Sequence, residues 1–322
     1  SAFEVENMEK VVVYAPATTA NLGPGFDVFG MALEQPHDIV VITRLPVHDG
    51  LKIHASGPFS EGIPVDPEKN TAGVVAQHFL QEFSIKSGLL IEIEKRIPPG
   101  FGLGSSAASA AAVAYGLNVL FNLGLDRRQL VHLAAKGEIA SAGFEHADNV
   151  SAAIYGGFVI IRAYDPLDIV PLKAPENLGV CVAIPKLPPQ PKKTEKARAV
   201  LPKMVPLEKI RSNVGNAAAM AVGFAIGDVE LIGRSMSDAI VEPARASLIP
   251  GYHIVREEAL KAGAYGVAIS GAGPSMIAVV DSSPAVISRV TAAMQRGFKS
   301  AGVVAETFYT KPGKGVTLLG VQ

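Results

Sequence analysis

Alternating and helical patterns of apolar residues divide the first half of the chain into strands and helices. Short apolar runs predict strands at residues 10–16, 38–45, 89–97 and 156–164. Helical periodicity predicts helices over residues 70–83, through the alanine-rich stretch after residue 105, from residue 126 and near residue 146. Interleaved strands and helices of this kind predict an α/β fold.

The second half begins after a segment rich in proline and lysine, residues 184–198, which cannot be regular in its first half. Helical patterns follow over residues 207–227 and 228–236. The last part predicts, in order, a strand at 265–270, a glycine turn, a strand at 275–281, a helix at 284–300 and a strand at 302–309. With a strand over residues 178–184 in front, this order resembles a βαββαβ ferredoxin-like unit.

Composition limits the classes of function. A length of 322 residues suits two domains, and 48% apolar residues can build a substantial core. The net charge of −1, without a basic block, gives no reason to expect a nucleic-acid or anionic-membrane partner. Cys181 is the single cysteine, which excludes an intrachain disulfide. Apolar runs stay short of the ~18 residues of a membrane span, and we expect a cytoplasmic protein.

The segment IPPGFGLGSSAASAAAVAYGLN, residues 97–118, is the most informative part of the chain. A predicted strand enters a glycine-rich turn, and the turn opens a helix. Glycines allow close backbone approach, and the first N–H groups of a helix favour anions, so the segment predicts a phosphate cradle. It lacks the Gly-Lys-Ser/Thr of a Walker A loop and the third glycine of a dinucleotide fingerprint. A glycine turn without a ligand is the simpler alternative.

Three motifs in order resemble those of the GHMP small-molecule kinases. They are YAPATTANLGPGFDVFG (14–30), PPGFGLGSSAA (98–108) and GVAISGAGPSMIAVV (266–280). The resemblance implies an α/β (α+β) two-domain kinase. Its N-terminal ATP-binding domain, residues 1–170, would be ribosomal-protein-S5-like, and its C-terminal domain, residues 171–322, ferredoxin-like.

The resemblance also implies ATP with Mg²⁺. Nucleotide contacts would come from the segment after the predicted strand and from one residue before it, namely Pro98, Pro99, Gly100, Phe101, Gly102, Leu103, Gly104, Ser105, Ser106, Ala107, Ala108 and Asn70. Ser106 and Glu138 would be the metal ligands, since Mg²⁺ takes one or two hard oxygens from a protein. The alternatives are a helix N-cap for Asn70 and a solvated helix acid for Glu138.

The substrate end of the site is implied by three further segments, ANLGPGFD (20–27), HADNV (146–150) and EPARASLIPGY (242–252). They resemble the kinase of this family that acts on a small hydroxyl-bearing amino acid. Arg198 and Arg245 would bind the carboxylate of that amino acid, because a guanidinium offers a planar fork of donors. Asn21, Asp27, His146 and Asn149 would complete the pocket. Asp27 would face the ammonium or the hydroxyl. The alternatives are surface arginines on loops and local turn residues.

Several siblings place an aspartate near the acceptor hydroxyl as a base, whereas this chain has Asn149 with Asp148 beside it. Adjacent helix residues point ~100° apart, so we expect only Asn149 to face the pocket. Asn149 and Asp27 are then the candidate catalytic residues, and no side chain is an obvious general base. A loose phosphoryl-transfer transition state needs little base assistance.

The sequence therefore predicts a kinase that phosphorylates the hydroxyl of an amino acid, with a homodimer as a candidate assembly. We expect Arg198 and Arg245 to lie on irregular segments, nearly fifty residues apart, and their guanidinium groups to converge on one pocket. The alternatives are another kinase of the family, acting on mevalonate or shikimate, and a non-catalytic regulator with the same fold.

Overall fold

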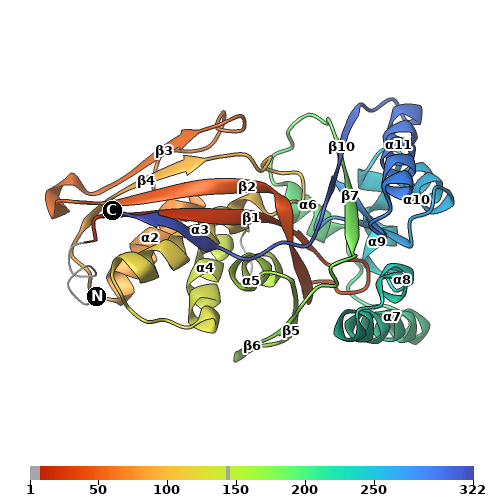
Figure 1. Ribbon diagram of the computed structural model, residues 1–322, viewed down its shortest axis with the longest axis horizontal. Coiled ribbons are helices and arrows are strands. Elements are labelled where there is room, and N and C mark those ends of the chain that lie inside the picture. Colours follow the sequence, from red (N-terminus) through yellow and green to blue (C-terminus); the bar gives the residue numbers. More distant parts are fainter. Residues whose placement is uncertain (1–7, 143–145) are drawn as a thin grey trace.

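The computed structural model describes residues 8–142 and 146–322 (Figure 1). Helices pack on two β-sheets, which confirms the predicted α/β class. None of the helices formed by the described residues is both long enough and apolar enough to cross a bilayer.

The first sheet holds seven strands in the described part of the chain, in the order β11-β1-β2-β4-β3, with β5 on the start of β2 and β6 on β5. All its pairings are antiparallel except that of β3 with β4. Its strands are β1 (Lys10–Ala20), β2 (Phe29–Leu45), β3 (Leu51–Ser56), β4 (Gly88–Glu94), β5 (Phe158–Tyr164), β6 (Leu167–Leu172) and β11 (Thr317–Val321).

Helices cover one face of this sheet, as Figure 1 shows. They are α2 (Thr71–Glu82), α3 (Ser105–Leu120), α4 (Arg127–Ala142) and α5 (Asp148–Tyr155); a 3₁₀ turn, η1 (Val47–Asp49), precedes β3. Helix α3 contacts β1, β2 and the other three helices. Small residues allow this central position, since a Cβ on Gly116 would lie 2.7 Å from the Cδ1 of Ile42. Helix α3, which follows the predicted phosphate loop (residues 98–104), is thus fixed in the core.

The second sheet has the antiparallel order β10-β7-β9-β8, which is the strand order of a ferredoxin-like unit. Its strands are β7 (Gly179–Pro185), β8 (Gly266–Ile269), β9 (Met276–Val280) and β10 (Ala305–Thr310). The remaining helices are α6 (Lys193–Ala199), α7 (Leu207–Ile226), α8 (Val229–Arg234), α9 (Val241–Arg245), α10 (Tyr252–Lys261) and α11 (Pro284–Ser300), with a 3₁₀ turn, η2 (Ala246–Leu248).

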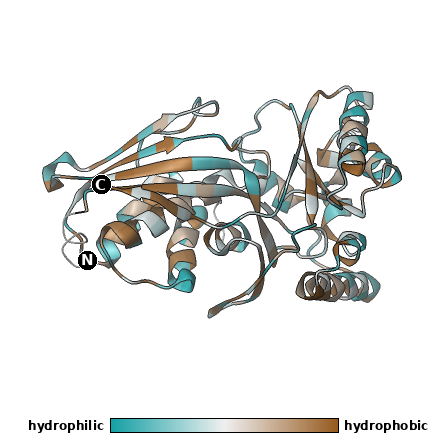
Figure 2. Cartoon of the chain, in the orientation of Figure 1, coloured by the Kyte–Doolittle hydropathy of each residue, from teal (hydrophilic) through white to brown (hydrophobic). Residues whose placement is uncertain are grey.

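Two apolar clusters hold the second sheet between its helices. Residues of α10 and α11 pack on one face, where Met276, Ala278 and Val280 of β9 are buried. On the other face, Ile277 and Val279 join residues of α7 and α8 in the cluster that extends into the first sheet. Figure 2 shows brown, apolar stretches along the ribbons of both sheets.

The two sheets are joined by packing and by the path of the chain. Phe158 of β5 stacks on Phe224 of α7 with ring centroids 3.8 Å apart. After β10 the chain returns to the first sheet as β11, which pairs with β1. The domain boundary near residue 170 stays a prediction. The last strand, β11, belongs to the first sheet although it lies near the end of the chain.

Candidate active site

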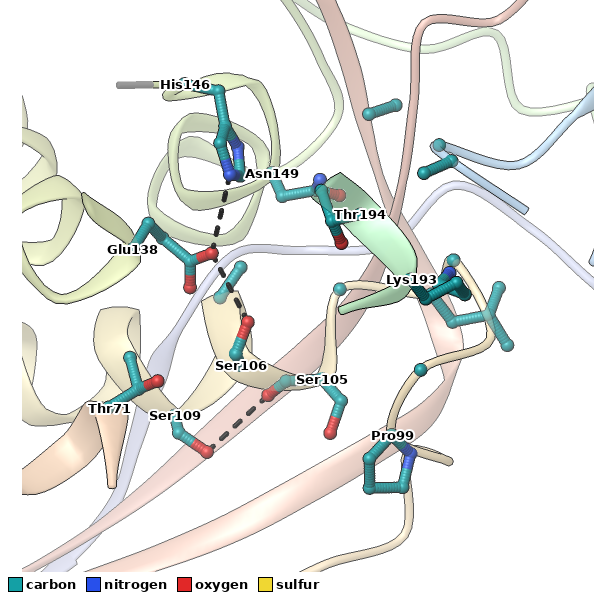
Figure 3. A pocket seen from close by; sticks show the side chains of 18 of the residues that line it. Thr71, Pro99, Ser105, Ser106, Ser109, Glu138, His146, Asn149, Lys193 and Thr194 are labelled. Carbon is teal, nitrogen blue, oxygen red and sulfur yellow. Dashed lines mark hydrogen bonds and ion pairs between the residues drawn. The ribbon is translucent and has the colours of Figure 1, made fainter. Parts of the chain in front are cut away.

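A cavity of about 690 Å³ lies among β1, the loop before α3, the helices α4, α5, α6 and α9, and the loop after β8. Most of the predicted site residues line it, namely Asn21, Asp27, Asn70, Pro99, Gly100, Gly102, Leu103, Gly104, Ser105, Ser106, Ala107, Glu138, His146, Asn149, Arg198 and Arg245. Pro98, Phe101 and Ala108, predicted with the same loop, are not among the described residues that border it. Figure 3 shows part of this cavity.

The loop before α3 presents the start of a helix to the cavity. Its glycines Gly100, Gly102 and Gly104 have φ angles of 78°, 79° and 69°, a region that glycine enters without strain. Helix α3 begins at Ser105, and its N-cap Gly104 makes no side-chain cap. The first N–H groups of a helix have no intrahelical partners, so this end of α3 suits an anion such as phosphate.

Two of these glycines are required for a reason that differs from the prediction. We expected them to let the backbone approach a ligand. A Cβ on Gly102 would instead lie 2.2 Å from the carbonyl oxygen of Ser270, and one on Gly104 would lie 2.0 Å from the Thr18 Oγ1. The missing side chains therefore make room for neighbouring protein, which holds the loop in place.

The third glycine motif, residues 266–280, forms hydrogen bonds to the phosphate loop. Ser270, which follows β8, donates its hydroxyl to the carbonyl of Gly102 at 2.6 Å. The Ser275 N–H donates to the carbonyl of Phe101 at 3.3 Å, and the Gly271 N–H donates to that of Ala20 at 3.1 Å. The motif thereby connects β1, the phosphate loop and the second sheet.

Ser106 and Glu138 lie together at the start of α3 (Figure 3). The Ser106 hydroxyl donates to the Glu138 Oε2 at 3.3 Å, and the His146 Nε2 is 3.9 Å from the same oxygen. Glu138 is only 4% exposed, and burial raises the pKa of its carboxyl, partly offset by His146 and the Ser106 hydroxyl. Two hard oxygens beside a helix N-terminus fit a Mg²⁺ ion held between protein and phosphate.

The two predicted arginines meet over one aromatic ring. The guanidinium carbon of Arg198 lies 5.0 Å from the ring centroid of Phe26, and that of Arg245 lies 5.5 Å from it. The guanidinium groups are therefore well within the ~15 Å over which two cations could share one small ligand. We expected both arginines on irregular segments; this was wrong, because Arg198 lies in α6 and Arg245 ends α9.

Polar contacts fix this arginine pair. Arg198 Nη2 donates to both carboxylate oxygens of Asp27, at 2.6 and 2.8 Å. Arg245 Nε donates to the carbonyl of Ala197, the residue before Arg198, at 2.9 Å. Burial, together with the charge of Arg198, lowers the pKa of Arg245 to about 10, which leaves it protonated at neutral pH. The part of the cavity lined by Arg198 and Arg245, the arginine corner, is thus cationic and suits a carboxylate.

Asn21 and Asp27 lie in a turn after β1, and both have positive φ angles, 73° and 57°. The Asn21 side chain accepts the Asp27 N–H at 3.1 Å and donates to the carbonyl of Gly271 at 3.2 Å. Burial raises the pKa of the Asp27 carboxyl, against the opposing hydrogen bond from Arg198. The turn role and the cavity position of these residues therefore occur together.

Asp148 and Asn149 both line the cavity, which corrects the expectation that only one could. Asp148 is the first residue of α5, and the end of the helix rather than its side faces the cavity. The Asp148 Oδ1 accepts the Asn149 N–H at 2.8 Å and lies 3.5 Å from the His146 Nδ1. The Asn149 Oδ1 accepts the Thr18 hydroxyl at 2.7 Å.

The ring of His146 lies between two acids. Burial by itself lowers the pKa of His146, but Asp148 and Glu138 outweigh burial, so the pKa is raised overall. Asn70 caps α2 by accepting the Ala72 N–H at 2.9 Å, and its side chain also borders the cavity. The cap and the cavity position, which the sequence allowed to occur together, both occur at Asn70.

Sequence reasoning missed four lysines that border the cavity, Lys69, Lys95, Lys192 and Lys193. Lys95 is buried, pairs with Asp38 and donates to the carbonyl of Ser105 at 3.0 Å. Lys95 continues the alternation of inward positions Leu89, Ile91 and Ile93. A charged residue at such a buried position was the sequence signal that could have identified Lys95. Lys193 donates to the carbonyl of Gly273, and burial, aided by Arg245, lowers its pKa to about 8.

Comparisons with known proteins show the family of the chain. The GHMP kinases N terminal domain matches residues 70–157, and the GHMP kinases C terminal domain matches residues 220–299. A homoserine kinase of Methanococcus vannielii is 49% identical over 84% of this chain and 88% of its own. One from Methanocella arvoryzae is 44% identical over 97% and 98%.

A solved structure supports the same assignment. The crystal structure of homoserine kinase from Cytophaga hutchinsonii superposes with a TM-score of 0.89 and 38% identity, over 97% of this chain and 98% of its own. Homoserine is the hydroxyl-bearing amino acid that the three substrate-end segments implied. The chain therefore belongs to the GHMP kinase family and, within it, to the homoserine kinases.

Proposed function

We propose that this enzyme transfers the γ-phosphoryl group of ATP to the side-chain hydroxyl of L-homoserine, giving O-phospho-L-homoserine, in threonine biosynthesis. One observation carries the substrate assignment. Arg198, Arg245 and Asp27 line the same cavity as the phosphate loop. A zwitterionic amino acid needs both charge signs at one end of its site, and a nucleotide needs a helix N-terminus at the other.

The nucleotide would lie along the loop and the start of α3. Backbone N–H groups from Gly102 to Ser106 would receive its phosphates, and Asn70, which lines the same cavity, would contact the adenine. The third glycine motif holds the loop rigid, as the bond from Ser270 to Gly102 indicates. A rigid cradle stabilises developing charge without reorganisation during the reaction.

Ser106 and Glu138 would hold Mg²⁺ through their side-chain oxygens. The distance of 3.3 Å between the Ser106 Oγ and the Glu138 Oε2, at the start of α3, supports this role. When bound, Mg²⁺ supplies charge neutralisation on the β- and γ-phosphates. Glu138 would be ionised in that state, because its metal ligand role requires a carboxylate.

The amino acid would occupy the arginine corner. The two guanidinium groups would bind its carboxylate, and Asp27 and Asn21 would receive its ammonium group. Asn149, held by the Thr18 hydroxyl at 2.7 Å, would orient the acceptor hydroxyl, with His146 beside it. The hydroxyl proton would leave late, to the transferred phosphoryl group, since positioning supplies much of the acceleration in such reactions.

Measuring ADP release with homoserine, mevalonate, shikimate and galactose side by side tests this function. We expect homoserine to give the highest kcat/KM by at least a hundredfold, because the other three lack an ammonium group. Comparable turnover of mevalonate or shikimate would favour another kinase of the family. ADP release with none of the four would favour a regulator. A cytoplasmic location is part of this proposal, because the reaction consumes ATP.

A homodimer is also part of the proposal, and the outer face of α7 supports it. Large apolar residues along one stripe of this helix are exposed, with Leu207 at 77% and Ile226 at 67%; the others are Ile210, Val214 and Val222. Figure 2 shows α7 at the edge of the molecule with apolar colouring. Pairing with a second copy would cover this stripe. Sedimentation should show a dimer that Val214→Glu dissociates; a monomeric native protein at micromolar concentration would contradict it.

A further inference from the structure

Glu242 carries a buried carboxyl group that the proposed reaction does not use. It lies in α9, is 6% exposed, and is not among the described residues that line the cavity. Its Oε1 accepts the backbone N–H of Ile269, and its Oε2 accepts the Tyr252 hydroxyl at 3.3 Å. Burying a carboxyl group is unfavourable unless it is hydrogen-bonded, and these two partners satisfy it.

The Ile269 N–H needs this acceptor because β8 is an edge strand of the second sheet. Hydrogen bonds alternate along an antiparallel strand. The next N–H, of Ser270, is bonded across to the carbonyl of Ser275. The Ile269 N–H therefore points away from the sheet, where Glu242 supplies its partner. A buried backbone N–H left without an acceptor is destabilising.

This bond joins the two halves of the active site. Ile269 is followed directly by Ser270, which holds Gly102 of the phosphate loop at 2.6 Å. In α9, Arg245 lies three residues after Glu242, so the two are one helical turn apart. The Arg245 Nε in turn holds the carbonyl of Ala197, next to Arg198.

We propose that Glu242 is a positioning residue that fixes Arg245 relative to the phosphate loop. The inference rests on the proposed function, in which Arg245 binds the substrate carboxylate. Through the bond to Ile269, Glu242 sets the distance between that carboxylate and the γ-phosphate end of the loop. A small displacement of either end would move the hydroxyl out of line with the phosphoryl group.

Helix α9 itself does not depend on the Glu242 side chain. Asp238 caps it by accepting the N–H groups of Val241 and Glu242, at 3.1 and 2.9 Å. Replacing the Glu242 side chain should therefore leave the helix formed but loosen its connection to β8. This makes the positioning role separable from folding.

Three single variants test the role by steady-state kinetics. Glu242→Met keeps the length of the side chain but removes the acceptor, and we expect KM for homoserine to rise at least fivefold with KM for ATP within twofold. Glu242→Gln keeps an amide oxygen for Ile269, so KM should return to within twofold of the native value. Tyr252→Phe removes only the other partner of Glu242 and should leave both KM values unchanged. If Glu242→Met does not fold, the shorter Glu242→Asp replaces it under the same expectations.

A double-variant cycle with Arg245→Leu decides the question. If Glu242 acts through Arg245, adding Glu242→Met to Arg245→Leu should change KM for homoserine by less than 1.5-fold. The full fivefold effect in that background, or no effect of Glu242→Met alone, would overturn the positioning role. Unchanged KM in Arg245→Leu alone would instead overturn the proposed carboxylate site and, with it, this inference.

Discussion

Replacing Arg245 by leucine removes one of the two cations expected to bind the substrate carboxylate. Arg245 is only 3% exposed, lies over Phe26 and stays protonated with a pKa near 10. A carboxylate beside it would be largely desolvated, and electrostatic attraction is strong where water is excluded. The geometry therefore assigns Arg245 a large share of substrate binding.

The expected magnitude follows from what remains after the change. Truncating one member of a desolvated charge pair typically costs ~2–5 kcal/mol. Arg198 stays in place, but its Nη2 already donates to both oxygens of Asp27, so it replaces the lost contact only in part. We expect KM for homoserine to rise at least tenfold, equal to ~1.4 kcal/mol, with KM for ATP nearly unchanged.

An assay of ADP release at varied homoserine and saturating ATP measures this effect. Arg162→Leu is the matched control, because Arg162 is 66% exposed on β5 and pairs with Asp168. The decarboxylated analogue 3-aminopropanol should be a poor substrate of the native enzyme and suffer little further loss in Arg245→Leu. An unchanged melting temperature would show that the variant is folded. A rise in KM below threefold in such a folded variant would refute the reasoning.

Three further predictions concern the metal pair, the loop and pH. Glu138→Ala should lower turnover by orders of magnitude and leave the fold intact; activity with Mg²⁺ within threefold of native, a cost of only ~0.65 kcal/mol, would refute the metal role. Gly104→Val should abolish ATP binding, because its Cβ would meet the Thr18 Oγ1 and displace the loop, and unchanged affinity by calorimetry would count against the cradle. Burial raises the pKa of Glu242 from 4.5 to about 8, and Asp238 raises it further, while the hydrogen bond from the Ile269 N–H, the charge of Arg256 and the Tyr252 hydroxyl oppose the rise. The folded state therefore binds more protons, and the free energy of unfolding should fall as pH rises from 4.5 to 8. Glu242→Gln should lose this part of the pH dependence, and parallel profiles for the two proteins in urea denaturation would contradict it.

Elements with strong local signals could be predicted from the sequence. The periodicity of residues 70–83 and the asparagine at their start predicted α2, which the structure caps with Asn70. The alternation of residues 89–97 predicted β4, and the βαββαβ order predicted the second sheet. In these places propensity, periodicity and capping all favour the same structure, which is where sequence reasoning is most dependable.

Features that depend on distant partners could not be predicted in this way. Strand β11 is short and partly exposed, and only its pairing with β1 defines it. Helix α6, which carries Arg198, lies in the second half of the segment rich in proline and lysine. Helix α9, which ends at Arg245, is accompanied by a tertiary contact between Glu242 and Ile269. The clash at Gly104 involves Thr18, far away in sequence, so the reason for that glycine was visible only in the fold.

The central claim is that one cavity holds the phosphates at the start of α3 and the amino acid at the arginine corner. A crystal structure with a non-hydrolysable ATP analogue, Mg²⁺ and L-homoserine tests it most directly. We predict the homoserine carboxylate within hydrogen-bond distance of Arg245 and Arg198, its hydroxyl directed at the γ-phosphate, and Mg²⁺ between that phosphate, Ser106 and Glu138. Homoserine bound with its carboxylate away from both arginines, or phosphates away from residues 102–106, would contradict the account.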